Sequence, residues 1–219
     1  MKMHCVYQIA GMMIALLCFS TQTIAAESNA QLLLPSTRSA SLKSFPKWTT
    51  MVDRYVTQKK VPIEKCNIVS YQPCAALKLW RDMLERVRGE SFAKQIELVN
   101  DWANEHDYVI DQINWGTEDF WATPNEFMTI NGDCEDYAIA KYYSLRALGI
   151  PKNRLRIIIV QDFNLGGIIH AILGVYESDA LYILDNQVKQ VMQAQKIYHY
   201  RPIYSINEEY WWLYSPGQS

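Results

Sequence analysis

The stretch Gly132-Asp133-Cys134-Glu135-Asp136-Tyr137-Ala138 predicts the start of a helix, and the other predicted elements lie before and after it. Asp133 is a favourable N-cap residue, and Asp136 follows three residues later in the position of a capping box. The run Gly149-Ile150-Pro151 then supplies the glycine and the proline that end helices. We therefore expect a helix over residues 134–148 with Cys134 at its first position.

Helical periodicity also precedes this stretch. Residues 75–88 place apolar side chains at helical spacing, and Gly89 ends the run. Ser91 opens a second predicted helix, whose apolar face consists of Phe92, Ile96, Val99 and Trp102. The first half of the chain is therefore expected to be helical.

Apolar runs of the kind that form strands follow the helix at Cys134. They cover residues 154–163, 170–176 and 180–186, with turn signals at 164–167 and at Glu177-Ser178-Asp179. The aromatic C-terminal part, through Trp211-Trp212, is expected to pack on the resulting sheet. The sequence predicts an α+β domain in which a helical N-terminal half packs on an antiparallel sheet.

Aromatic residues are dense between the predicted helices, over residues 107–131. They are Trp115, Phe120, Trp121 and Phe127, with Pro124 among them. Such residues pack in a core or line a substrate groove, and the sequence leaves both interpretations open.

The first 45 residues carry an export pattern. Lys2, an apolar run over residues 6–19 and a small-residue stretch ending in Ala25-Ala26 have the order of a cleavable secretory signal over residues 1–26. An uncleaved membrane anchor is the alternative, although the apolar run is short for a membrane span. Residues 27–45 are polar and are interpreted as a tether, which leaves residues 46–219 as the domain. We therefore expect a periplasmic protein.

Export leaves three cysteines, Cys66, Cys74 and Cys134. An odd number in an oxidising compartment leaves one thiol unpaired. Cys66 and Cys74 are close in sequence and flank a loop-like stretch, so we expect them to form a disulfide and Cys134 to be free. A disulfide between Cys134 and one of the other two is the alternative. The net charge of -2, without a basic cluster, argues against a nucleic-acid partner.

A free thiol at a helix N-terminus is suited to nucleophilic catalysis, because the exposed amides favour a thiolate. The thiol also needs a base, and His106, His170 and His199 are the candidates after export. His170 begins a predicted strand, and Asp185 ends the next one. A two- or four-residue turn near Glu177–Asp179 that sets residue 170 opposite residue 185 would let Asp185 orient the imidazole. A three-residue turn would place the two side chains on opposite faces.

Three carboxylates, those of Asp133, Glu135 and Asp136, surround Cys134 and should disfavour a thiolate. Acidic residues are common at helix N-termini because they complement the helix dipole. They can also bind a divalent cation, and oxygen ligands alone suit Ca²⁺ better than zinc. Both interpretations remain open on spacing alone.

Longer motifs carry a family resemblance. Trp121-Ala122-Thr123-Pro124, the Gly132–Ala138 stretch and Leu184-Asp185-Asn186 closely resemble the bacterial transglutaminase-like cysteine proteinases, from about Leu77 to the C-terminus. The resemblance implies a papain-like, transglutaminase-type fold and a catalytic triad of Cys134, His170 and Asp185. It also implies calcium at Asp133, Glu135 and Asp136, a protein substrate such as a large surface adhesin, and an inner-membrane receptor that regulates the enzyme. The sequence around Cys66 and Cys74 departs from what the adhesin-processing branch leads us to expect.

The leading hypothesis is a periplasmic cysteine endopeptidase that depends on calcium. Acyl transfer to an amine is the second hypothesis, because an acyl-enzyme can be resolved by water or by an amine. A non-enzymatic, calcium-dependent binding module is the third.

Overall fold

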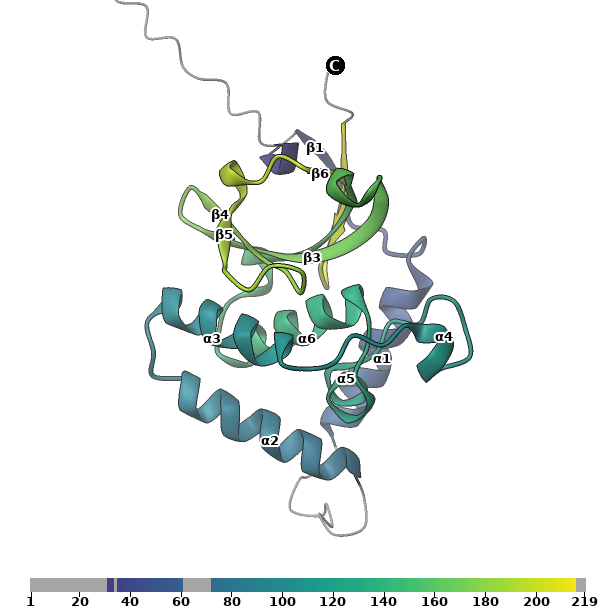
Figure 1. Cartoon of the computed structure of the whole chain (residues 1–219), viewed down its shortest axis with the longest axis vertical. Helices are drawn as coiled ribbons and strands as arrows, with labels where there is room; N and C mark the ends of the chain where they lie inside the picture. Colours follow the sequence, from purple (N-terminus) through teal and green to yellow (C-terminus); the bar gives the residue numbers. More distant parts are fainter. Residues whose placement is uncertain (1–30, 34, 61–71, 216–219) are drawn as a thin grey trace, which may run out of the picture.

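A computed structural model describes residues 31–33, 35–60 and 72–215 of the 219-residue chain. Helices α1 to α6 follow the first strand and form one layer, and a curved sheet forms the other (Figure 1). The helices are α1 (Pro46–Lys59), α2 (Gln72–Val87), α3 (Phe92–Asn104), α4 (Asp111–Asn114), α5 (Pro124–Ile130) and α6 (Cys134–Ala147). The helices predicted over 75–88, after Ser91 and over 134–148 are confirmed as α2, α3 and α6.

Helix α6 lies at the centre of the helical layer. It is enclosed on all sides, and the eleven residues from Glu135 to Leu145 are all buried. A helix surrounded in this way has no single apolar stripe, which explains why polar residues such as Lys141 and Ser144 occur among the buried ones. The Trp80 indole of α2 donates to the Ser144 hydroxyl at 2.8 Å and links the two helices.

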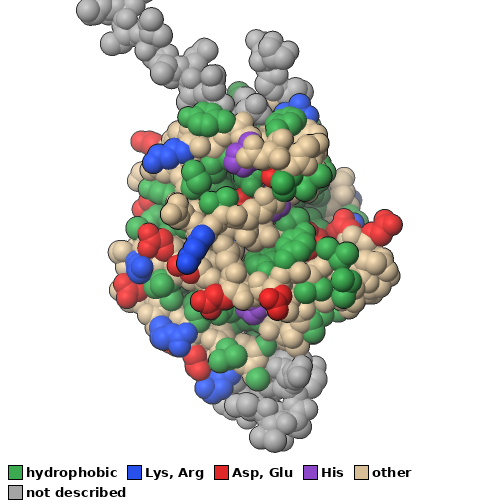
Figure 2. Space-filling view, in the orientation of Figure 1, with side chains coloured by type: hydrophobic (Ala, Val, Ile, Leu, Met, Phe, Trp, Pro, Cys, Tyr) green, Lys and Arg blue, Asp and Glu red, His purple; other side chains and the backbone are tan. Residues whose placement is uncertain are grey.

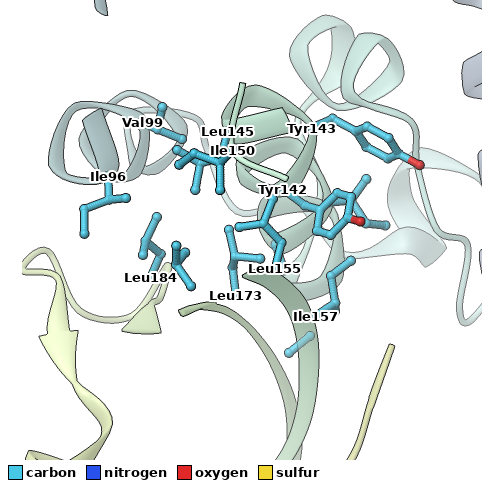
Figure 3. Close-up of a cluster of buried hydrophobic side chains, with 14 of the residues drawn as sticks. Ile96, Val99, Tyr142, Tyr143, Leu145, Ile150, Leu155, Ile157, Leu173 and Leu184 are labelled. Atoms are coloured by element: carbon cyan, nitrogen blue, oxygen red, sulfur yellow. The ribbon is translucent and has the colours of Figure 1, made fainter. Parts of the chain in front are cut away.

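Side chains from α3, α6 and the sheet meet in the main hydrophobic core (Figure 3). Ile96 and Val99 come from α3, Tyr142 and Leu145 from α6, and Leu173 from the sheet. The helix that begins at Cys134 is thereby fixed against the strands that carry the predicted base and acid.

The strands of the described residues form one antiparallel sheet in the order β1-β7-β6-β2-β3-β4-β5. They are β1 (Ser36–Ser39), β2 (Leu155–Asp162), β3 (Ile168–Glu177), β4 (Ala180–Leu184), β5 (Met192–Gln193), β6 (Tyr200–Ile206) and β7 (Trp211–Tyr214). The central strand β2 is buried on both faces, which explains its unbroken Ile and Val run. The predicted α+β class, with an antiparallel sheet after the helices, is confirmed.

A second hydrophobic cluster fills the concave side of the curved sheet, away from the helices (Figure 1). Strand residues such as Ile158 and Ile172 meet Leu32 of the short helix η1 (Gln31–Leu33) and Ala194 of η5 (Ala194–Lys196) there. The sheet therefore has a core on each face.

Two sequence predictions are corrected by this sheet. Part of the predicted tether is folded: Leu32 is buried, and β1 pairs with β7 from Ser36 to Ser39. An edge strand is held by main-chain hydrogen bonds, so its exposed Ser, Thr and Arg side chains show no apolar alternation in the sequence. The aromatic C-terminal part does not pack on the sheet but forms two of its strands, β6 and β7.

Other predictions fall outside the described residues. The signal at 1–26 lies there, as do Cys66 and the side chain of Cys74, so their disulfide stays a prediction. None of the helices in the described part has the length and hydropathy needed to cross a membrane.

Candidate active site

Cys134 occupies the first position of α6, as predicted, and Asp133 precedes it as N-cap. The Asp136 carboxylate accepts the main-chain N–H of Asp133 through Oδ2 at 3.4 Å. Its other oxygen accepts the N–H of Ala122 at 2.7 Å, on the segment that leads into α5. Asp136 therefore fixes the residue before the cysteine to a separate part of the helical layer.

The Cys134 thiol lies against β3. The main-chain N–H of Ala171, the residue after His170, points to the sulfur. In this structure the thiol donates its own hydrogen bond to Glu135 Oε2 at 3.3 Å rather than to an imidazole. Burial raises the pKa of the thiol, and the Glu135 and Asp133 carboxylates raise it further, whereas the Ala171 N–H lowers it.

The pairing of β3 with β4 differs from the predicted register. The turn consists of Ser178 and Asp179, Glu177 pairs with Ala180, and Leu173 pairs with Leu184. Continued by one residue, this register sets Asp185 beside Ile172, so Asp185 is not directly opposite His170. The two side chains still share a face, because residues two apart on a strand point the same way.

The diagonal arrangement brings the predicted base and acid into hydrogen-bond contact. His170 Nε2 lies 2.9 Å from Asp185 Oδ1, and both side chains are 3 % exposed. Because Nε2 is taken by the carboxylate, Nδ1 is the ring nitrogen left for a thiol or a substrate. The structure thus brings together two of the three predicted catalytic residues and places Cys134 beside the strand that carries the base.

Asp185 is held as an anion. Burial alone would raise its pKa, but hydrogen bonding and charge from His170, the Tyr200 hydroxyl and the Gln187 N–H hold the pKa of Asp185 below its usual value. Asn104 of α3 donates to the main-chain oxygen of Asp185 at 2.8 Å. The acid is therefore fixed from both layers of the fold.

The acids near Cys134 form a larger cluster than the sequence predicted. Asp111, Asp133 and Asp136 bring one carboxylate oxygen each to within 4.8 Å of one another, and so do Asp111, Asp119 and Glu135. Asp111 belongs to both sets, although it lies more than twenty residues before Cys134. A search for acids adjacent to the cysteine in sequence could not find it.

Burial and, to a smaller extent, mutual repulsion disfavour the ionised form of this acidic cluster. Burial, with smaller contributions from neighbouring acids, raises the pKa of Asp111 to about 6 and that of Glu135 to about 10. The pKa of Asp136 is raised well above its usual range for the same reasons. Two buried oxygens, Asp111 Oδ1 and Asp133 Oδ1, have no hydrogen-bond partner among the described residues. The residues therefore fit a hard cation with oxygen ligands.

The other candidate bases lie elsewhere. His106 packs between Trp102 and Phe127 and contacts Asn131 through Nδ1 at 3.3 Å. Burial lowers its pKa. His199 stacks on Tyr200, with ring centroids 4.2 Å apart. No hydrogen bond joins either of them to a carboxylate in the described part of the chain, which sets His170 apart.

The aromatic segment at 107–131 contributes side chains to the core, and its role in a substrate groove stays a prediction. Trp121 and Phe127 are buried core residues, whereas Trp115 and Phe120 are only partly buried. Tyr108, Ile110 and Ile113 of this segment are exposed apolar residues, as are Ile168 and Ile169, which precede His170 in the sequence. Figure 2 shows hydrophobic side chains gathered on this face where the helical layer meets the sheet.

A cysteine at the start of a central helix, packed against an antiparallel sheet with a His–Asp pair, defines a papain-like, transglutaminase-type cysteine peptidase fold. The sequence profile of the bacterial transglutaminase-like cysteine proteinases matches residues 64–216. The chain therefore belongs to this family of cysteine proteinases.

Solved structures agree with this assignment. LapG from Legionella pneumophila is 31 % identical, with a TM-score of 0.61 over 70 % of this chain and 88 % of LapG. Its calcium-bound form is 30 % identical over 73 % of this chain and 92 % of LapG, with a TM-score of 0.61. The EGTA-treated form is 30 % identical over 73 % of this chain and 89 % of LapG, with a TM-score of 0.62. The comparison with curated proteins gave no match.

Proposed function

We propose that this protein is a periplasmic, calcium-dependent cysteine endopeptidase with Cys134 as nucleophile, His170 as base and Asp185 as orienting acid. The observation that carries the proposal is the buried His170–Asp185 hydrogen bond on the strand against which the Cys134 thiol lies. Family membership supports the reaction class.

The residues divide the chemistry as follows. His170 takes the proton of the Cys134 thiol as the sulfur attacks the carbonyl carbon of the scissile peptide bond, and the carbonyl oxygen becomes an oxyanion that the Cys134 N–H can stabilise. His170 gives its proton to the leaving amine as the carbon–nitrogen bond breaks, which leaves an acyl-enzyme. His170 then takes a proton from water, whose oxygen attacks the thioester, and the proton returns to the sulfur as the acid product leaves. Asp185 keeps the imidazole in one tautomer throughout.

Calcium belongs to the proposal because the acidic cluster fits it. Asp133, Glu135 and Asp136, joined by Asp111 and Asp119, would hold the ion. A bound cation supplies positive charge that offsets the carboxylates next to the thiol. Asp111 Oδ1 and Asp133 Oδ1, which accept no hydrogen bond from the described residues, would become ligands of the ion. The Glu135 carboxylate, which accepts the hydrogen bond of the thiol here, would be one of the ligands of the ion.

The substrate is proposed to be a polypeptide, as membership of a proteinase family implies. The exposed apolar side chains of residues 108–113 and of Ile168 and Ile169 suit an unfolded protein segment. The relationship to LapG leads us to propose a cell-surface adhesin as substrate and an inner-membrane receptor as regulator. Export to the periplasm rests on residues 1–26 and is tested by N-terminal sequencing of the periplasmic fraction.

The deciding experiment compares the wild type with Cys134→Ala on an unfolded protein substrate in the presence of calcium. The wild type should cut, and Cys134→Ala should bind without cutting and keep its circular dichroism spectrum. Labelling by a thiol-reactive activity probe should be lost in parallel. A variant that still cuts would exclude Cys134 as nucleophile. Products that carry an added amine would indicate acyl transfer, and a wild type with an unreactive thiol would indicate a binding module.

A further inference from the structure

Tyr200 on β6 contacts the proposed catalytic acid directly. Its hydroxyl donates a hydrogen bond to Asp185 Oδ2 at 2.5 Å, while Oδ1 accepts from His170 and from the Gln187 N–H, each at 2.9 Å. Tyr200 is 1 % exposed, and its ring centroid lies 5.8 Å from that of His170. Both oxygens of the carboxylate are therefore held, and Tyr200 holds the one that His170 does not.

A bulge in the sheet makes this contact possible. Ile159 of β2 pairs with Tyr204 of β6, but the next residue, Val160, pairs with Pro202, so β6 has one extra residue there. A one-residue shift reverses which face a side chain points to. Without the bulge, Tyr200 would point away from His170; with it, both side chains project from the same face.

We propose that Tyr200 is a positioning residue of the triad, whose hydroxyl fixes the Asp185 carboxylate and through it the orientation and tautomer of His170. This inference rests on the proposed function. The geometry explains the need for such a residue, because β4 ends at Leu184 and the sheet does not hold Asp185 itself.

The other groups near Asp185 cannot replace the tyrosine. Gln187 and His170 bind Oδ1, and Asn104 binds the main-chain oxygen. The buried Lys141 ammonium acts on Asp185 by charge, but its Nζ forms no hydrogen bond in the described residues. Removal of the Tyr200 hydroxyl would therefore leave an anionic oxygen buried without a donor, free to rotate away from its present plane.

The test compares Tyr200→Phe with Tyr214→Phe. Tyr214 is a matched control, because it is also buried and its hydroxyl contacts Ser205 at 3.1 Å. Nitrogen-15 NMR of the His170 ring reports which nitrogen carries the proton. The wild type and Tyr214→Phe should show the proton on Nε2 alone, and Tyr200→Phe a mixture of tautomers. Alkylation of Cys134 by iodoacetamide, followed by peptide mass spectrometry with calcium present, should slow about tenfold or more only in Tyr200→Phe.

A second pair of variants tests the same hydroxyl if the Tyr200→Phe protein does not fold. 4-Fluorophenylalanine at position 200 keeps the packing without a donor and should show mixed tautomers, whereas 4-aminophenylalanine restores a donor and should restore one tautomer. A single tautomer and a wild-type alkylation rate with 4-fluorophenylalanine would overturn the inference, as would equal losses in Tyr214→Phe. A wild-type Cys134 that alkylates no faster than an ordinary thiol would contradict the proposed function instead, and the NMR result would still decide the role of Tyr200.

Discussion

Gly132 lies directly against Asp136: a Cβ built on Gly132 would fall 2.7 Å from the Cβ of Asp136 and would collide with its carboxylate. The same carboxylate accepts the N–H groups of Ala122 and Asp133. The backbone that leads into Cys134 is therefore fixed by the buried Asp136 carboxylate, which fits only against a glycine at position 132.

Gly132→Ala should destabilise the protein and displace the start of α6. The added methyl group must push Asp136 from its two main-chain donors, and we expect a loss of about 1–3 kcal/mol in the free energy of unfolding. Urea unfolding checks this. Gly89→Ala is the control, since nothing lies within 4 Å of a Cβ there, and it should be neutral or slightly stabilising. Equal stabilities of the two variants would exclude the packing argument.

Calcium removal should make stability depend on pH in a defined direction. Asp111 and Glu135 have folded-state pKa values of about 6 and about 10, above their ordinary values of 3.8 and 4.5. The folded protein then binds more protons than the unfolded chain, so the free energy of unfolding falls as pH rises from about 4 towards these values. In EGTA, the melting temperature should therefore decrease across this range.

Added calcium should raise the melting temperature most at the high-pH end, where the acids are ionised. At a hundredfold excess over Kd, mass action gives about 2.7 kcal/mol. Asp111→Asn should weaken this response, whereas Asp82→Asn, at an exposed ion pair on α2, should not. A melting temperature that is indifferent to EGTA and calcium would remove the ion from the proposal.

Much of the fold and part of the site were predictable because they depend on local sequence. The cap at Asp133, the stop at Gly149 and the Ile and Val runs gave α6, β2 and β3 close to their observed bounds. His170 and Asp185 were found because a hairpin confines both residues to a short segment. The register was wrong by two residues, yet the contact formed, because a shift by an even number keeps both side chains on the same face and within reach.

The remaining features depend on contacts between distant segments. Asp111 joins the acids at Cys134 through tertiary packing, and Tyr200 reaches Asp185 only through the bulge opposite Ile159 and Val160. Strand β1 is polar and exposed, so its pairing with β7 left no apolar pattern to detect. Each of these requires knowledge of what lies opposite a residue, which a single sequence does not contain.

Asp185→Asn tests whether the catalytic base is His170, the histidine that Asp185 holds, or another histidine. An amide keeps the shape but cannot hold the imidazole as a carboxylate does, so we expect kcat to fall roughly a hundred- to ten-thousandfold. Cleavage of an unfolded substrate at saturating calcium measures this. His199→Gln should retain activity, because the His199 ring packs on Tyr200 and forms no hydrogen bond to a carboxylate of the described residues. If His199→Gln lost activity and Asp185→Asn kept it, the base would be His199 and not His170.

Lys141 provides a test of stability that is independent of catalysis. It is fully buried on α6, its ammonium lies 5.9 Å from the Tyr137 ring centroid, and its Nζ has no hydrogen-bond partner in the described part of the chain. Burial lowers the pKa of Lys141 from 10.5 to about 7, although the charge of Asp185 opposes the shift. Between these values the unfolded chain binds the extra proton, so the free energy of unfolding should rise with pH from about 7 to about 10.5.

Lys141→Met removes this titration and keeps a similar length of side chain. The variant should be more stable than the wild type at pH 6, by roughly 3–5 kcal/mol, and the advantage should shrink as pH approaches 10. Urea unfolding at several pH values measures the slope. Lys78→Met is the control, because Lys78 is exposed on α2 and should leave the slope unchanged. A Lys141→Met protein that is less stable than the wild type at pH 6 would contradict this prediction. The buried ammonium would then stabilise the folded state, through its charge interaction with Asp185.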